Sequence, residues 1–209
     1  GTIPNVSVAV NDVREDEGVA AVTFTIPRSN ETGSTITWSA QSGTAVADRD
    51  FGQVLGEVIY MEPGVTSYTR TVPLLQDDLS EGPETVLLNV AVSEGLTFTG
   101  GPVSFRILDD EPVPEVSLTN AMPVAEGGVL RFAVELDRIS AQPVSVQVQT
   151  ADGTALAGGD YTAVNTTVTI PPGQTVGEVF ILTTDDSVDE GPQTLALNIT
   201  GADGATIGD

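Results

Sequence analysis

Asp152-Gly153-Thr154-Ala155-Leu156-Ala157-Gly158-Gly159-Asp160-Tyr161 is the stretch that decides the organisation of this chain, because it has an earlier counterpart. The counterpart reads Ser42-Gly43-Thr44-Ala45-Val46-Ala47-Asp48-Arg49-Asp50-Phe51. Further motifs return in the same order at spacings of 108 to 110 residues: Glu17-Gly18 as Glu126-Gly127, Pro63-Gly64 as Pro172-Gly173, Asp77-Asp78 as Asp185-Asp186, and Glu81-Gly82-Pro83 as Glu190-Gly191-Pro192. Self-similarity at a fixed period indicates repeated structural units. The sequence therefore predicts two homologous domains, residues 1–112 and 113–209, joined at Glu111-Pro112-Val113-Pro114.

Outside these motifs, apolar and polar residues alternate in short runs that end at Gly, Pro, Asn or Asp, and this pattern predicts β-strands. Val22, Phe24 and Ile26 give one such run. Each domain holds six or seven of them, the number typical of an immunoglobulin-like β-sandwich. We expect an all-β chain of two tandem, antiparallel sandwiches. The second has no counterpart of Val103–Leu108, so we expect it to lack its last strand and to expose an unpaired sheet edge.

The composition excludes several classes of function. The 209 residues carry a formal net charge of −23 and contain no Lys, Cys or His. Nucleic acid is excluded as a partner because phosphate binding needs clustered basic residues. Disulfides, zinc sites and histidine or cysteine catalysis are excluded by the missing side chains. No stretch approaches the roughly 20 apolar residues that span a bilayer, so we expect no direct membrane insertion by this segment.

The acidic residues gather at strand ends and turns rather than within strands. Alternate loops of an antiparallel sandwich emerge at the same end, so carboxylates that are distant in sequence can meet there. Carboxylates brought close together repel one another unless a cation joins them. A set of oxygen ligands without nitrogen or sulfur selects Ca²⁺, with Mg²⁺ as the second choice. A solvated acidic surface, of the kind seen in halophiles, is the alternative explanation.

The order of these motifs resembles the Calx-beta domain. That order is Glu-Gly, Asp-Gly-Thr-Ala-x-Ala-Gly-x-Asp-Tyr, Pro-Gly, Asp-Asp, Glu-Gly-Pro-Glu and a final Asp-Asp-Glu, and two copies cover essentially the whole chain. The resemblance implies a seven-stranded immunoglobulin-like sandwich. Members of this family serve as calcium sensors in sodium/calcium exchangers, occur in an integrin beta subunit, and are repeated in bacterial surface proteins.

The resemblance also implies a set of calcium ligands in each copy. In the first copy they are Glu17, Asp50, Asp77, Asp78, Glu81, Glu84, Asp109, Asp110 and Glu111; in the second they are Glu126, Asp160, Asp185, Asp186 and Glu190. The first copy departs from the motif at Ser42, Asp48 and Phe51, and Arg49 places a positive charge beside the ligands. The second has Gln193 where the first has Glu84, one extra residue before Glu190 in this alignment, and no final Asp-Asp-Glu. We expect the second site to be the weaker one.

These features predict a calcium-binding structural or adhesive segment of a larger extracellular or cell-surface protein, in which Ca²⁺ rigidifies the domains and the linker. The expected partners are calcium ions, neighbouring repeats of the parent protein and a cell-surface or protein ligand. A calcium-sensing module of a membrane transporter is the alternative. A glycoside hydrolase that uses a carboxylate pair is more remote, because a sugar cleft needs aromatic platforms. Trp38 alternates with Ile36 and Ala40, so we expect it in the core, where it cannot stack on a sugar ring. We therefore expect that the chain is not an enzyme.

Overall fold

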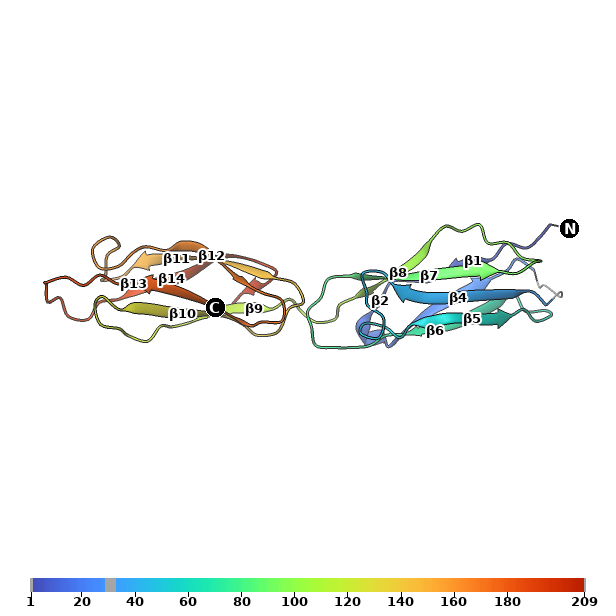
Figure 1. Cartoon of the computed structure of the whole chain (residues 1–209), viewed down its shortest axis with the longest axis horizontal. Helices are drawn as coiled ribbons and strands as arrows, with labels where there is room; N and C mark the ends of the chain where they lie inside the picture. Colours follow the sequence, from blue (N-terminus) through green and yellow to red (C-terminus); the bar gives the residue numbers. More distant parts are fainter. Residues whose placement is uncertain (1, 29–32, 209) are drawn as a thin grey trace. The chain divides into compact units, whose positions relative to one another are not determined.

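The structure is a computed structural model that describes residues 2–28 and 33–208. Residues 1 and 209, the outer ends of the two expected domains, lie outside the described part. The chain forms two compact units, Gly1–Asp77 with Gly82–Asp110, and Asp78–Glu81 with Glu111–Asp209. Figure 1 labels the strands of both. Each unit is a β-sandwich, as the alternating pattern predicts.

The first unit packs a three-stranded sheet, β1-β3-β6, against a five-stranded sheet, β2-β8-β7-β4-β5. A single turn of 3-10 helix, η1 (Glu15–Glu17), follows β2. The strands are β1 (Ser7–Ala9), β2 (Val13–Arg14), β3 (Val19–Thr25), β4 (Thr35–Ser42), β5 (Val54–Tyr60), β6 (Ser67–Pro73), β7 (Glu84–Val92) and β8 (Val103–Leu108).

The second unit consists of a four-stranded sheet, β13-β10-β9-β15, and a three-stranded sheet, β12-β11-β14. Its strands are β9 (Glu115–Thr119), β10 (Val129–Leu136), β11 (Val144–Asp152), β12 (Asn165–Ile170), β13 (Val176–Leu182), β14 (Leu195–Asp203) and β15 (Thr206–Ile207). Within the described residues, nothing occupies the place beside β14 that β8 takes beside β7 in the first unit. The part of the chain that the structure describes thus holds no counterpart of β8 in this unit, as the sequence comparison of the two copies predicts.

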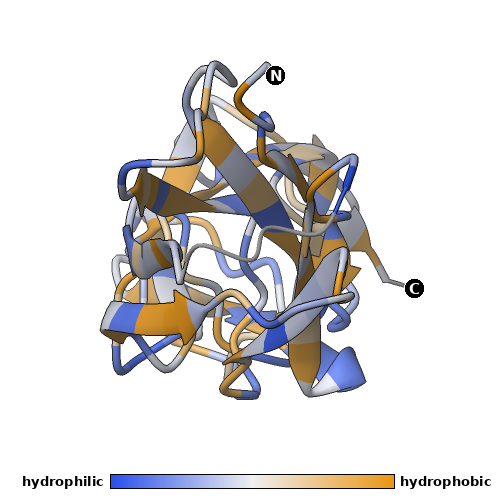
Figure 2. Ribbon diagram, turned by 90° about the vertical axis from the view of Figure 1, so that its right-hand side faces the viewer, coloured by the Kyte–Doolittle hydropathy of each residue, from blue (hydrophilic) through white to orange (hydrophobic). Residues whose placement is uncertain are grey.

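Alternation along the strands builds the core of each unit, and hydrophobic and hydrophilic residues follow one another along the ribbons in Figure 2. Trp38 is 1% exposed, packs its ring against Phe24 at 5.7 Å between centroids, and donates its indole N–H to Glu57 at 3.1 Å. It is a core residue, as its spacing predicts. Tyr161, the counterpart of Phe51, is buried in the core of the second unit at 2% exposed.

Three short elements depart from the predicted antiparallel pattern. β2 pairs with β8, and β15 pairs with β9, in parallel rather than antiparallel register. Each is two residues long, too short to show an alternating pattern, and η1 is three residues long. In the described part of the chain, no helix has the length and apolar character that crossing a bilayer requires.

Candidate metal centres

The first candidate centre is built around a buried acid, Glu15. β2 places Val13 in the core, and Glu15, two residues further along, points to the same inner side. Glu15 is 5% exposed, although a carboxylate is rarely buried without a partner. One of its oxygens accepts a hydrogen bond from the backbone N–H of Asp77, in the loop after β6.

Two further acids reach Glu15 from the end of β8. Ligand oxygens of Glu15, Asp109 and Asp110 all lie within 4.8 Å of one another. Asp110 accepts a hydrogen bond from the side-chain amide of Gln76 at 2.9 Å through one oxygen, Oδ2. Its other oxygen, Oδ1, is buried without a hydrogen-bond partner among the described residues. A buried carboxylate oxygen without a partner is costly, and a bound cation would satisfy it.

The charges around Glu15 are negative. The pKa of Glu15 is raised from 4.5 to about 7: burial is the main cause, the charges of Asp77, Asp110 and Asp109 add to it, and the hydrogen bond from the Asp77 N–H opposes it. Two mechanisms can relieve this repulsion, protonation of one acid or binding of a cation. No arginine is among the groups that shift the pKa of Glu15, and the chain contains no Lys or His, so a counterion from solution is the cation available to this group at neutral pH.

A neighbouring pair of acids, Asp50 and Glu84, already has a counter-charge. Their oxygens also lie within 4.8 Å of one another. The Arg49 guanidinium lies 3.1 Å from Asp50 Oδ1 and 3.7 Å from Glu84 Oε1. Asp50 is 4% exposed, and its Oδ2 accepts the N–H of Val46 at 2.6 Å. Arg49 therefore competes with any metal ion for these two carboxylates.

The second unit holds a corresponding group, Asp160, Asp186 and Glu190, with ligand atoms within 4.8 Å of one another. Asp160 Oδ2 accepts the N–H of Leu156 at 2.7 Å, which repeats the contact of Asp50 with Val46. Gly159 stands in the place of Arg49, so no arginine competes here. The pKa of Glu190 is raised, first by burial and then by the charges of Asp160 and Asp186, with Glu126 adding a smaller effect.

The hydrogen-bond register corrects one pairing of the two copies. The N–H of Leu75 donates to Asp50 O at 3.0 Å, and the N–H of Thr184 donates to Asp160 O at 2.8 Å, so Leu75 matches Thr184. Counting onward from this pair, Asp77 matches Asp186 and Gln76 matches Asp185. The spacing is then 109 from Asp77 through Glu81, and no extra residue precedes Glu190.

The predicted ligands fall into two sets. Asp50, Glu84, Asp109 and Asp110 in the first unit, and Asp160, Asp186 and Glu190 in the second, lie in the groups described above, and a carboxylate oxygen of Asp77 also lies within 4.8 Å of one of Glu15. Glu81 and Glu111 belong to the second unit by contacts, and their role as ligands of the first site stays a prediction. Glu17, Asp78, Glu126 and Asp185 do not belong to a group of this kind within the described residues. Glu15 is a new member, marked in the sequence only by its two-residue spacing from Val13.

Each group offers carboxylate oxygens without nitrogen or sulfur, and this donor set fits a hard cation such as Ca²⁺. The acids come from separate loops, so a cation bound there would link the ends of several strands. Such a site forms only in the folded chain, and binding would therefore stabilise the fold.

A family model for the Calx-beta domain matches the chain twice, over residues 2–111 and 109–206. Adhesion G-protein coupled receptor V1 of Danio rerio is 29% identical over 223 residues, an alignment that covers 93% of this chain but 4% of the receptor. The crystal structure of CBD12 from CALX1.2 aligns with a TM-score of 0.47 and 19% identity, covering 96% of this chain and 81% of that one. Apo-form Calx CBD1 aligns with a TM-score of 0.48 and 23% identity, covering 53% of this chain and 100% of that one. Because the two family matches together cover nearly every residue, the chain belongs to the Calx-beta family.

Proposed function

We propose that this chain is a calcium-binding segment of a larger cell-surface or extracellular protein, in which Ca²⁺ stiffens each sandwich by joining loops at its end. The observation that carries the proposal is the group of Glu15, Asp109 and Asp110, in which a buried carboxylate meets two others and one oxygen of Asp110 has no hydrogen-bond partner among the described residues. An acidic surface that is merely solvated does not need a carboxylate in the core.

The cell-surface assignment rests on the likeness to the Danio rerio receptor, of which the chain spans a small part. A structural or adhesive role is proposed because the chain consists of two tandem domains of one family. Neighbouring repeats and a protein ligand at the cell surface are the proposed partners. Since Glu111-Pro112-Val113-Pro114 directly follows Asp109 and Asp110, Ca²⁺ is also proposed to restrain this linker.

The test is isothermal titration of chelator-treated protein with Ca²⁺ and, separately, with Mg²⁺. We expect saturable Ca²⁺ binding that Asp109→Asn/Asp110→Asn weakens by at least about tenfold, since two ligands are lost. Glu62→Gln/Asp203→Asn removes the same charge from exposed acids outside the groups, and its titration should match that of the unaltered chain. Equal effects of both double variants would show that only net charge matters and would contradict the proposal.

The measured affinity separates two roles. A dissociation constant of about 10⁻⁴ to 10⁻³ M is typical of extracellular modules, and one of about 10⁻⁷ to 10⁻⁵ M is typical of intracellular sensors. The first range supports the cell-surface role. The second would favour the calcium-sensing module of a transporter.

A further inference from the structure

We propose that the second unit carries N-linked oligosaccharides at Asn165 and Asn198, both on the outer face of the sheet β12-β11-β14. Such sugars are added to proteins that enter the secretory pathway. The proposal therefore rests on the cell-surface part of the proposed function, and it is independent of the calcium centres.

The chain is rich in acceptor motifs for this modification. Four of its seven asparagines are followed two residues later by Ser or Thr, with no Pro between them. Asn-x-Ser/Thr is the acceptor motif for N-linked glycosylation, which adds a bulky, solubilising sugar at the protein surface. The four motifs begin at Asn5, Asn30, Asn165 and Asn198.

The structure separates these four asparagines. Asn30 lies outside the described residues. Asn5 is held in the fold, because its Oδ1 accepts hydrogen bonds from the N–H of Thr99 at 3.1 Å and from the Thr97 hydroxyl at 3.2 Å. Asn165 and Asn198 are exposed, and neither side chain makes a hydrogen bond to another described residue. Their carboxamide nitrogens are therefore available for modification.

The two acceptors meet on one face of the sheet. Asn165, the first residue of β12, and Asn198, in β14, both pair with Gln149 of β11, which lies between them. Directly paired residues of neighbouring strands point to the same side of a sheet, and the strands lie about 4.8 Å apart. The two asparagines are therefore roughly 10 Å apart on the same side.

The hydroxyl of each motif is on this face as well. Residues two apart in a strand point to the same side, and Thr167 and Thr200 are both exposed. Thr167 pairs with Gln147, and Thr200 donates its hydroxyl to Gln147 O at 3.3 Å. The asparagine and the hydroxyl that define each motif are thus presented to solvent together.

The face around the two motifs is uncharged. Its two central rows are Asn165-Gln149-Asn198 and Thr167-Gln147-Thr200. On the other sheet of the unit, the outer side of β10 and β13 carries an ion pair, Arg131 with Glu178. Amides and hydroxyls both donate and accept hydrogen bonds, as the hydroxyls of a neutral sugar require. A chain of net charge −23 therefore offers a neutral surface where the sugars attach.

The exposure of this face does not depend on what lies beside β14. Asn89 of β7 is the counterpart of Asn198 at the spacing of 109, and it is exposed although β8 pairs with β7. A neighbouring strand thus extends the sheet without covering its outer face. Asn89 is followed by Val90 and Ala91, so the first unit lacks the motif at this place.

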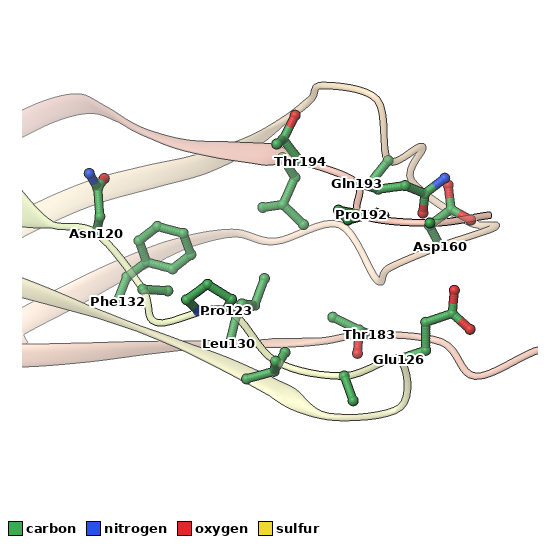
Figure 3. A pocket seen from close by; sticks show the side chains of 16 residues that line it. Asn120, Pro123, Glu126, Leu130, Phe132, Asp160, Thr183, Pro192, Gln193 and Thr194 are labelled. Atoms are coloured by element: carbon green, nitrogen blue, oxygen red, sulfur yellow. The ribbon is translucent and has the colours of Figure 1, made fainter. Parts of the chain in front are cut away.

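The inner side of the same sheet is a separate place. There Leu195, at the start of β14, lines a pocket of about 500 Å³ together with Leu130 and Phe132 (Figure 3). Leu197 follows on the same side and is 7% exposed. Asn198 points away from this side, because successive residues of a strand alternate. A sugar on Asn198 therefore leaves the packing between the two sheets undisturbed.

The modification joins the carboxamide nitrogen of asparagine to C1 of the first sugar of a lipid-linked oligosaccharide diphosphate. The N–C1 bond forms as the bond from C1 to the diphosphate oxygen breaks. The diphosphate leaves with the bonding electron pair, and one amide proton passes to a base of the transferase.

The test is secretion of the whole chain from cultured animal cells behind a cleavable leader. Release of the sugars with peptide N-glycosidase in water labelled with heavy oxygen converts each modified Asn to a labelled Asp, which mass spectrometry of peptides locates. We expect label at Asn165 and Asn198. Thr167→Val and Thr200→Val should each lose the label at the asparagine of their own motif, whereas Thr200→Ser should keep it. Label that persists in both Val variants would contradict the motif.

Ala91→Thr is the matched gain of function. It completes a motif at Asn89, on the corresponding face of the first unit and at exposed positions, and should add a labelled site there. Label at Asn89 in this variant, without label at Asn165 and Asn198, would show that the transferase reached the chain and passed over the proposed sites. Absence of label at all three asparagines would also overturn the proposal.

Calcium titration of the secreted chain separates this inference from the proposed calcium centres. Calcium binding by a chain that carries no sugar at Asn165 or Asn198 would overturn the glycosylation alone. Sugars at both sites on a chain that binds no Ca²⁺ would support the glycosylation and overturn the calcium centres.

Discussion

At the scale of single residues, Glu15 is the acid that is both buried in the sandwich and part of a group of carboxylates at its end. Its buried carboxylate has a pKa of about 7, compared with 4.5 for an ordinary glutamate. Between these two values the unfolded chain has released the proton and the folded chain has kept it. The folded state therefore binds more protons, and its stability falls as pH rises through this range.

We predict that the first unit of the calcium-free protein loses roughly 3 kcal/mol of unfolding free energy between pH 4.5 and pH 8 on account of Glu15, because each pKa unit corresponds to about 1.4 kcal/mol. Urea unfolding in chelator, followed by the fluorescence of Trp38, measures this unit alone, since Trp38 is the single tryptophan. Glu15→Gln should flatten the profile. The matched change Glu17→Gln, at the exposed end of η1, should leave the profile as it is.

Asp152 and Tyr161 form a hydrogen-bonded pair in the second copy that the first copy does not have. The Tyr161 hydroxyl donates to Asp152 Oδ1 at 2.5 Å, and the same oxygen accepts the N–H of Ala157 at 2.8 Å. This hydroxyl contact lowers the pKa of Asp152. In the first copy, Ser42 accepts the N–H of Ala47 at 2.9 Å, and Phe51 has no hydroxyl to offer. Ser42 and Phe51, the two departures of the first copy from the family motif, are therefore linked: the acid and the hydroxyl that form one hydrogen bond in the second copy are both replaced.

We predict that Tyr161→Phe alone destabilises the second unit, because the buried Tyr161 side chain loses its hydrogen bond to Asp152. Asp152→Ser/Tyr161→Phe should cost less than the sum of its single changes, because it recreates the pair in the first copy. Chemical unfolding followed by circular dichroism gives the cycle, once the transition of the first unit has been identified by the fluorescence of Trp38. Strict additivity would contradict the linkage, and Tyr60→Phe, at a residue that is 70% exposed, serves as the neutral control.

At the scale of elements, the strands could be predicted and the short elements between them could not. The predicted strand at Val103–Leu108 has the bounds of β8, because its two-residue alternation reflects one face buried against the other sheet. β2 is set by pairing with β8 at the opposite end of the unit's sequence, and two residues carry no periodic signal. For the same reason Glu15 was not among the predicted ligands, since its burial depends on β2.

The pairing of Asp185 illustrates the same limit in the site. Each copy contains two adjacent aspartates, and a sequence alignment that matches these pairs places Asp77 opposite Asp185. The backbone hydrogen bonds of Leu75 to Asp50 and of Thr184 to Asp160 instead make Leu75 and Thr184 equivalent. Asp186 is then the counterpart of Asp77. Sequence alone identified which loops carry the acids. Which carboxylates meet depends on backbone register, and a shift of one residue decides it.

β8 also allows a prediction about the closing strand. Phe105→Ala removes a ring that is 1% exposed in the core of the first unit and should destabilise this unit by about 3 to 5 kcal/mol. Tyr60→Ala, at an exposed position on the edge strand β5, should change stability by less than about 0.5 kcal/mol. Unfolding followed through Trp38 compares the two directly. Similar losses for both would mean that β8 adds little to the core.

At the scale of the whole molecule, a net charge of −23 on 209 residues opposes folding through self-repulsion. Salt of any kind relieves this repulsion by screening, whereas Ca²⁺ bound in the acidic groups relieves it at particular points. The two effects differ in their dependence on concentration. Screening grows gradually with ionic strength, and site binding follows the occupancy of the site.

We therefore predict that Ca²⁺ raises the Tm above the value reached in NaCl or MgCl₂ of the same ionic strength. At 100 times its dissociation constant, a single bound ion contributes about 2.7 kcal/mol to the folded state. Differential scanning calorimetry of the unaltered chain and of Asp109→Asn/Asp110→Asn measures the difference. The variant should keep the gain from salt and lose the additional gain from Ca²⁺ in the first unit. If the three salts raise the Tm equally in both proteins, the acids act as a solvated surface of the halophile kind, and the calcium centre is wrong.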